Sequence, residues 1–213
     1  MKQNNKIVVG ILIFDQVEVL DVTGPFEVFS VTRTNENRRR EESSPFRVLL
    51  VSEDTKRVTA VGGLVFTPDT TIHNCPDLDL LIVPGGWGTR TEISNKMIIE
   101  WIADRAYKTR LTASVCTGSS LLGRAGLLNG REATTHWQAF DFLRESAPAV
   151  KIREDVRFTT APPIFTSAGI SSGIDLALKI VSYFLGIEIG KATAKHMEYP
   201  YPESDLRIVT RKS

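Results

Sequence analysis

The sequence predicts an α/β sandwich whose central sheet is mainly parallel and carries helices on both faces. Short apolar runs without alternation recur along the chain, as strands do when both faces of a sheet are buried. Segments with helical period lie between and after these runs, so strand and helix alternate. The chain has 213 residues, 42% of them hydrophobic and 24% charged, which is the profile of a single globular domain spanning residues 1–213.

The apolar runs assigned to the parallel sheet each end at Gly, Pro, Asp or Cys. They are Ile7 to Phe14, Arg47 to Val51, Leu78 to Val83 and Leu111 to Val115. A further pair of short runs, Val58 to Ala60 and Leu64 to Thr67, flanks Gly62-Gly63. A double glycine between two such runs predicts a small β-hairpin beside the main sheet.

Four segments place apolar residues at helical spacing. The spacing is carried by Val28, Phe29 and Thr32; by Ile98, Trp101, Ile102 and Ala106; by Leu121, Leu122, Ala125 and Leu128; and by Ile174, Ala177, Leu178, Val181 and Phe184. The polar stretch from Thr34 to Pro45 follows the first of these and is expected to be a solvated loop. Its three arginines, 38 to 40, are followed at once by two glutamates, which argues against a nucleic-acid patch.

The charge balance favours a small-molecule partner. The 26 Lys and Arg residues against 25 Asp and Glu leave a net charge of +1, so no global excess attracts nucleic acid or an anionic membrane. Two cysteines, Cys75 and Cys116, are too few for a disulfide scaffold and favour a reducing compartment. Because no apolar run reaches the roughly 18 residues that span a bilayer, we expect a cytoplasmic protein.

Cys116 is the strongest candidate for chemistry. The strand Leu111 to Val115 runs directly into it, and Thr117, Gly118 and Ser119 then open a helix. A strand-to-helix turn of this kind raises its central side chain above the sheet, as in the nucleophile elbow of hydrolases. The helix N-terminus is expected to stabilise a thiolate there. The alternative is that Cys116 is a small buried residue that ends a strand.

Two further glycine-containing turns follow predicted strands. Val83 to Gly88 (VPGGWG) closes one strand, and its glycines let backbone amides approach a ligand beside the thiol; a tight turn with no ligand is the alternative. Ser167 to Asp175 (SAGISSGID) again combines a strand end, a glycine and a helix start. Since the carboxyl ends of parallel strands meet at one edge, we expect the three turns to meet there.

Asp21 is the candidate acid or base. It stands between apolar residues immediately before a helix whose first turn we expect to carry Pro25 and Glu27. One interpretation makes Asp21 the N-terminal cap of that helix. The other makes it a partly buried acid/base that faces the thiol, with a pKa raised by burial or lowered by amide hydrogen bonds.

The three histidines give weaker signals. His136 follows Cys116 by 20 positions, far enough for a return strand to bring it near the thiol, although a packed structural histidine beside Trp137 is the alternative. His73 and Cys75 lie two positions apart with no second ligand pair nearby, so no metal site is predicted. His196 indicates no function.

Five blocks of the sequence together resemble the ThiJ/PfpI superfamily, and within it most closely the isonitrile (isocyanide) hydratases. The blocks are Asp21 to Pro25, Pro84 to Gly86, Ser114 to Ser119, Ala133 to Trp137 and Gly169 to Asp175. The resemblance runs from about Lys6 to about Tyr199. It implies a flavodoxin-like three-layer sandwich of the class I glutamine amidotransferase-like type, usually a homodimer, with no cofactor and no metal.

The resemblance also implies the roles of the site residues. In such hydratases the matching cysteine attacks the terminal carbon of R–N≡C to give a thioimidate, and water then releases an N-substituted formamide. Carried over, Cys116 is the nucleophile, Asp21 handles protons and water, and Thr117 contributes its hydroxyl. The backbone amides of Gly86, Thr117 and Ile170 would surround the sulfur and the polar intermediate.

Other members of the superfamily supply the alternatives. Protease-like and deglycase-like branches commonly carry a histidine or a small residue after the nucleophile and a glutamate near the first strand, where this chain has Thr117 and Asp21. The same blocks occur in the sensing domain of AraC-type regulators, whose cysteine site binds a ligand and whose chain continues into a DNA-binding domain; residues 202–213 are too few for one. Amidase, peptidase or glyoxalase activity and ligand or redox sensing by an exposed thiolate therefore remain alternatives.

Overall fold

A computed structural model describes residues 6–206 of the chain, so the last part of the segment after residue 202 and the first five residues lie outside the described range. Its main sheet has seven strands in the order β10-β11-β7-β6-β1-β2-β5. Every neighbouring pair is parallel except β10 with β11. The strands are β1 (Ile7–Leu12), β2 (Phe46–Ser52), β5 (Thr70–Thr71), β6 (Leu80–Val83), β7 (Leu111–Val115), β10 (Phe158–Ala161) and β11 (Ile164–Ser167). The predicted mainly parallel sheet is confirmed.

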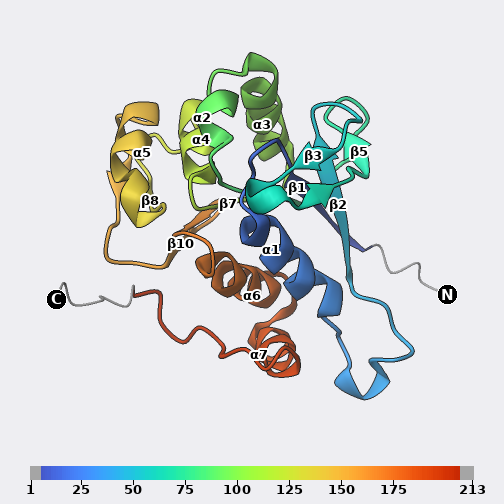
Figure 1. Ribbon diagram of the computed structural model, residues 1–213. Coiled ribbons are helices and arrows are strands. Elements are labelled where there is room, and N and C mark those ends of the chain that lie inside the picture. Colours follow the sequence, from blue (N-terminus) through green and yellow to red (C-terminus); the bar gives the residue numbers. More distant parts are fainter. Residues whose placement is uncertain (1–5, 207–213) are drawn as a thin grey trace.

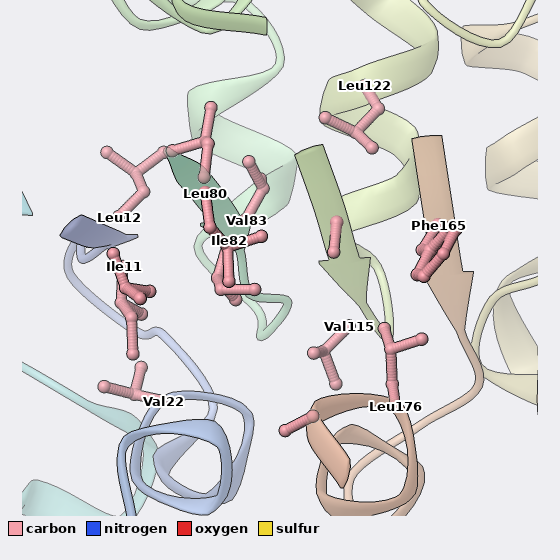
Figure 2. Packing of buried hydrophobic residues seen from close by; sticks show 14 of the residues in the cluster. Ile11, Leu12, Val22, Leu80, Ile82, Val83, Val115, Leu122, Phe165 and Leu176 are labelled. Atoms are coloured by element: carbon pink, nitrogen blue, oxygen red, sulfur yellow. The ribbon is translucent and has the colours of Figure 1, made fainter. Parts of the chain in front are cut away.

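Helices cover both faces of this sheet (Figure 1). On one face lie α1 (Val19–Val31), α6 (Ser172–Leu185) and α7 (Ile187–His196). On the other lie α2 (Thr89–Glu92), α3 (Lys96–Lys108), α4 (Gly118–Arg124) and α5 (Phe140–Ser146). Figure 2 shows the resulting contacts, with Val22 and Leu176 on one side of the strands and Leu122 on the other.

Two short strand pairs lie outside the main sheet. β3 (Val58–Thr59) and β4 (Val65–Phe66) form an antiparallel pair around the double glycine, which confirms the predicted hairpin. β8 (Glu132–Ala133) and β9 (Lys151–Ile152) form a parallel pair. Three short 3-10 segments, Glu36–Arg38, Val61–Gly63 and Trp137–Ala139, complete the elements.

Burial of both faces explains why the strands contain so few polar residues. Val9, Ile11, Leu80 and Leu111 have no exposed surface. Each such side chain contributes about 1.5–3 kcal/mol by leaving water. A strand with polar residues at alternate positions would leave unpaired polar groups under a layer of helices. Continuous apolar runs therefore predict a sheet that is covered on both faces.

The order of the strands places a crevice at the carboxyl ends of β1, β6 and β7. The parallel strands β2-β1-β6-β7-β11 follow the flavodoxin order. In this order the second strand lies on one side of the first, and the later strands are added on the other side. The connection after β1 passes through α1 on one face, and the connection after β6 passes through α3 on the other. Ligands of such folds bind at this reversal, beyond the carboxyl ends of the strands.

The first helix begins earlier than the sequence suggested. We expected Pro25 in its first turn, but α1 begins at Val19 and Pro25 lies inside it. Proline is unfavourable there because it lacks the N–H that would bond to the carbonyl four residues earlier, which here belongs to Asp21. Asp21 is consequently within the first turn of α1 and is not its N-terminal cap, so the capping interpretation is wrong.

Among residues 6–206, no helix is long and apolar enough to cross a bilayer.

Candidate active site

The three glycine-containing turns meet at one cavity of about 440 Å³, as expected from their places after β6, β7 and β11. A cavity of this size suits a small molecule. It is lined by Glu18, Gly86, Trp87, Arg90, Cys116, Thr117, His136, Gln138, Ala139 and Ile170.

Cys116 occupies a strained backbone position between β7 and α4. Its φ is +56°, a left-handed conformation that costs a residue with a side chain about 1–2 kcal/mol. Its amide donates to the carbonyls of Ser167 and Ala168 at 3.1 and 3.2 Å. Its carbonyl accepts from the hydroxyls of Ser119 and Thr135 at 3.0 and 2.9 Å. Hydrogen bonds on both sides of the residue thus hold the elbow that the sequence predicted.

The thiol of Cys116 is buried and favours its protonated form. Only 7% of the residue is exposed, and burial followed by the nearby Asp21 carboxyl raises the thiol pKa above its ordinary value. The amide and hydroxyl of Thr117 act in the opposite direction, but they do not outweigh burial. Desolvation of the sulfur therefore acts against the expected thiolate and favours the thiol.

Asp21 lies beside this thiol and is also protonated near neutral pH. The residue has no exposed surface, and burial raises the pKa of its carboxyl to about 8 despite the hydrogen bond from the Gly85 amide to Oδ2 at 2.9 Å. The charge of Glu18 raises this pKa further, while the Cys116 thiol and the Ile170 amide, which both approach the carboxyl, lower it. Within the described part of the chain, Oδ1 has no partner at strict hydrogen-bonding geometry. Asp21 is thus a neutral, buried acid with one unpartnered oxygen, placed behind Cys116 and not among the residues that line the cavity.

Thr117 connects the nucleophile to the glycine turn after β6. Its Oγ1 accepts from the Gly86 amide at 3.0 Å and from the Thr89 hydroxyl at 3.1 Å. The Gly86 carbonyl can accept from Thr89 at 2.8 Å or from Thr117 at 3.2 Å. Each hydroxyl has one proton, so Thr89 donates either to that carbonyl or to Thr117, and Thr117 donates either to that carbonyl or to the sulfur of Cys116.

The three predicted backbone donors therefore have different partners. The Thr117 amide faces the sulfur, as expected. The Ile170 amide approaches the carboxyl of Asp21. The Gly86 amide is bonded to Thr117 Oγ1, so its expected place at the sulfur is corrected: it acts on the site through the threonine hydroxyl. Sequence reasoning identified the turn but could not assign each amide to an acceptor.

Gly85 is required by the close approach of the two turns. A Cβ atom at this position would lie 2.6 Å from both the amide nitrogen and Oγ1 of Thr117, and 2.8 Å from Cβ of Cys116. Contacts this short are incompatible with the present backbone. The absence of a side chain at Gly85 therefore lets its amide reach Asp21 while Thr117 stays beside the sulfur.

His136 lines the cavity, and its ring packs on the turn after β11, where a Cβ at Gly169 would overlap it. Its Nδ1 accepts from the Gln138 amide at 3.3 Å, and its ring lies 5.8 Å from that of Trp137. The preceding residue, Thr135, holds the carbonyl of Cys116. No group of three or more metal-ligating side chains occurs within residues 6–206, and His73 and Cys75 form no such cluster.

Sequence reasoning missed several residues of this site. Thr135 stands inside a block that the sequence analysis quoted, yet only its neighbour His136 was considered. Thr89 and Arg90 follow the double-glycine turn and begin α2. A helix that starts directly after a predicted site turn could have marked both residues as candidates. Glu18 gave no signal, because its effect on Asp21 depends on the helix beginning at Val19.

A family profile decides the relationship that the five blocks suggested. The profile of the DJ-1/PfpI family matches residues 6–183. The chain belongs to the DJ-1/PfpI family. It is 37% identical over 199 residues to isonitrile hydratase of Pseudomonas putida, covering 92% of this chain and 81% of that protein. It is 28% identical over 191 residues to the transcriptional regulator GbdR of Pseudomonas aeruginosa, covering 90% of this chain but only half of the regulator.

Solved structures of this family share the fold. A ThiJ/PfpI family protein from Pseudomonas syringae superposes with a TM-score of 0.80 at 28% identity, covering 94% of this chain and 78% of that one. DJ-1beta of Drosophila melanogaster superposes with a TM-score of 0.78 at 17% identity, covering 92% of this chain and all of that one. The flavodoxin-like fold is confirmed.

Proposed function

We propose that this protein is an isonitrile hydratase, which converts R–N≡C to an N-substituted formamide through a thioimidate on Cys116. The observation that carries the proposal is the contact between a buried thiol and a carboxylic acid whose pKa is about 8. The similarity to the hydratase of Pseudomonas putida, at 37% identity over most of both chains, supports the same conclusion.

A protonated acid suits the first step because an isonitrile becomes electrophilic at its terminal carbon when that carbon accepts a proton. Asp21 donates its proton from Oδ1 to the carbon, the sulfur of Cys116 forms the new C–S bond, and the thiol proton passes to the carboxylate. The sum of these transfers is addition of S–H across the isonitrile carbon. A thiol with a raised pKa is then no obstacle, because its proton has an acceptor within the pair.

Water completes the reaction. It adds to the thioimidate carbon, and Asp21 supplies a proton to the nitrogen and accepts one from the attacking water. The C–S bond then breaks as the formyl C=O forms, and the proton of that hydroxyl group passes through Asp21 to the sulfur. Thr117, through its amide and hydroxyl, would stabilise the sulfur as it leaves.

Isotope labelling tests this sequence of bonds. The protein is mixed with p-nitrophenyl isocyanide in H₂¹⁸O, and the expected product is the formamide carrying one ¹⁸O atom. A quenched sample is expected to contain protein heavier by the mass of one intact isonitrile. The Cys116→Ala variant is the control and should give neither signal. Formamide release by that variant at the wild-type rate would contradict the proposal.

Ligand sensing is the second candidate, favoured by the match to half of GbdR. A folded protein that binds small ligands in this cavity but converts no isonitrile would support it. Redox sensing through an exposed thiolate has less support, because Cys116 is buried and its pKa is raised. The homodimer and the lack of nucleic-acid and membrane partners stay predictions.

A further inference from the structure

Within the described residues, Arg90 is the one arginine that lines the cavity together with Cys116. It lies in α2, directly after Thr89, whose hydroxyl bonds to Thr117 beside the sulfur. Its guanidinium carbon stands 4.6 Å from the ring centre of Trp87 and 5.2 Å from that of Phe142. Rings from the turn after β6 and from α5 therefore lie within cation–π distance of this guanidinium.

The charge of Arg90 is not matched by a carboxylate. Within residues 6–206 its side chain takes part in no ion pair or hydrogen bond, whereas those of other arginines do: Arg38, Arg39, Arg144, Arg153 and Arg157 each pair with Asp or Glu. Aromatic rings position a guanidinium without using its five N–H donors. Arg90 is itself exposed, so the mouth of the cavity carries a cation whose donors are available to a ligand.

The cavity also has an uneven distribution of charge. Among the described residues that line it, Glu18 is the one carboxylate, and its charge raises the pKa values of Asp21 and Cys116. The charge of Glu18 thus acts on Cys116 and Asp21, whereas the cation of Arg90 lies beside the rings of Trp87 and Phe142. An anionic ligand would be repelled from the reacting end and attracted to Arg90.

We propose that Arg90 binds a carboxylate on the substrate, so that this site prefers isocyano acids to neutral isonitriles. The guanidinium fork matches a carboxylate with two parallel hydrogen bonds, and repulsion from Glu18 turns the neutral isonitrile carbon toward Cys116. Trp87, which is 64% exposed, offers its ring to the group that joins the two ends. This inference rests on the proposed function and specifies its substrate class.

Two acid and ester pairs of different length test the proposal. The substrates are isocyanoacetate and 4-isocyanobenzoate, each beside its methyl ester, and kcat/KM is measured for all four. The proteins are wild type, Arg90→Lys, Arg90→Met and the control Arg124→Met, which removes an exposed arginine at the far end of α4. The intrinsic difference in reactivity between acid and ester cancels when the acid-to-ester ratio is compared between variants.

We expect wild type to prefer the acid in at least one pair. Arg90→Met should lower that acid-to-ester ratio at least tenfold, Arg90→Lys should retain part of it, and Arg124→Met should leave it unchanged. Added NaCl should raise KM for the acid more than for the ester. If both ratios in Arg90→Met stay within twofold of wild type while the esters are hydrated, this inference is overturned and the proposed function stands. If folded wild type hydrates none of the four compounds, both are overturned.

Discussion

Replacing Asp21 by asparagine should change how the stability of the protein depends on pH. In the folded protein the carboxyl has a pKa of about 8, against an ordinary value of 3.8. Between these values the folded state holds a proton that the unfolded state has lost, so stability falls as pH rises. The contribution is fully present below the unfolded pKa and is lost as pH rises through the folded pKa.

The size of the effect follows from that difference. A one-proton difference changes the free energy of unfolding by about 1.4 kcal/mol per pH unit, so Asp21 alone should cost wild type about 3 kcal/mol between pH 5 and pH 7. Asparagine cannot ionise and escapes this loss. The difference in free energy of unfolding between wild type and Asp21→Asn should therefore fall with this slope and flatten above about pH 8.

Urea titrations from pH 5 to pH 9 measure this difference directly, since groups that do not interact with Asp21 contribute equally in the two proteins. Glu27→Gln, which removes an exposed carboxyl from the same helix, is the control. Parallel stability profiles for wild type and Asp21→Asn would refute the reasoning, because they would mean that Asp21 ionises in the folded protein as it does in the unfolded one.

Further substitutions test other parts of the site. Thr117→Val should reduce kcat for an isonitrile about tenfold or more, measured at saturating substrate, because the sulfur loses a hydroxyl donor. An unchanged kcat would show that the Thr117 hydroxyl does not assist the sulfur of Cys116. Cys116→Gly should unfold at higher urea than Cys116→Ala, by about 1 kcal/mol, because glycine accepts the positive φ; equal midpoints would argue against strain. Gly85→Ala should cost about 1–3 kcal/mol in urea unfolding, since its Cβ would meet Thr117, and native stability would contradict the close contact. Thr135→Val should lower both stability and kcat, because the carbonyl of Cys116 loses the hydrogen bond from Thr135. If neither changes, the hydroxyl of Ser119 alone is enough to hold that carbonyl.

The sequence predicted those features that depend on local pattern. The apolar run Leu111 to Val115 coincides with β7, and small residues after Cys116 predicted the elbow that its positive φ confirms. Strand ends in a parallel sheet lie at one edge, so the meeting of three turns also followed from sequence. Gly62-Gly63 predicted a hairpin for the same reason, because a double glycine between apolar runs has few other uses.

Features that depend on contacts between distant segments were not predictable. The start of α1 was misplaced because Pro25 usually begins a helix, and only the packing of the helix shows that Asp21 lies inside it. The pKa values of Asp21 and Cys116 depend on burial, which composition does not give. The bond from the Gly86 amide to Thr117 joins residues 31 positions apart, and no local pattern specifies it.

The hydration of p-nitrophenyl isocyanide by wild type, Cys116→Ala and Asp21→Asn, followed by absorbance with each protein shown to be folded, tests the central claim most directly. Wild type should form the formamide with a kcat/KM that falls as pH rises above about 8, because Asp21 must be protonated. Cys116→Ala should be inactive, and Asp21→Asn should be slower by about 10²- to 10⁴-fold. Wild-type activity in either variant, or no formamide from folded wild type, would contradict the assignment of this thiol and carboxylic acid as a pair that hydrates isonitriles.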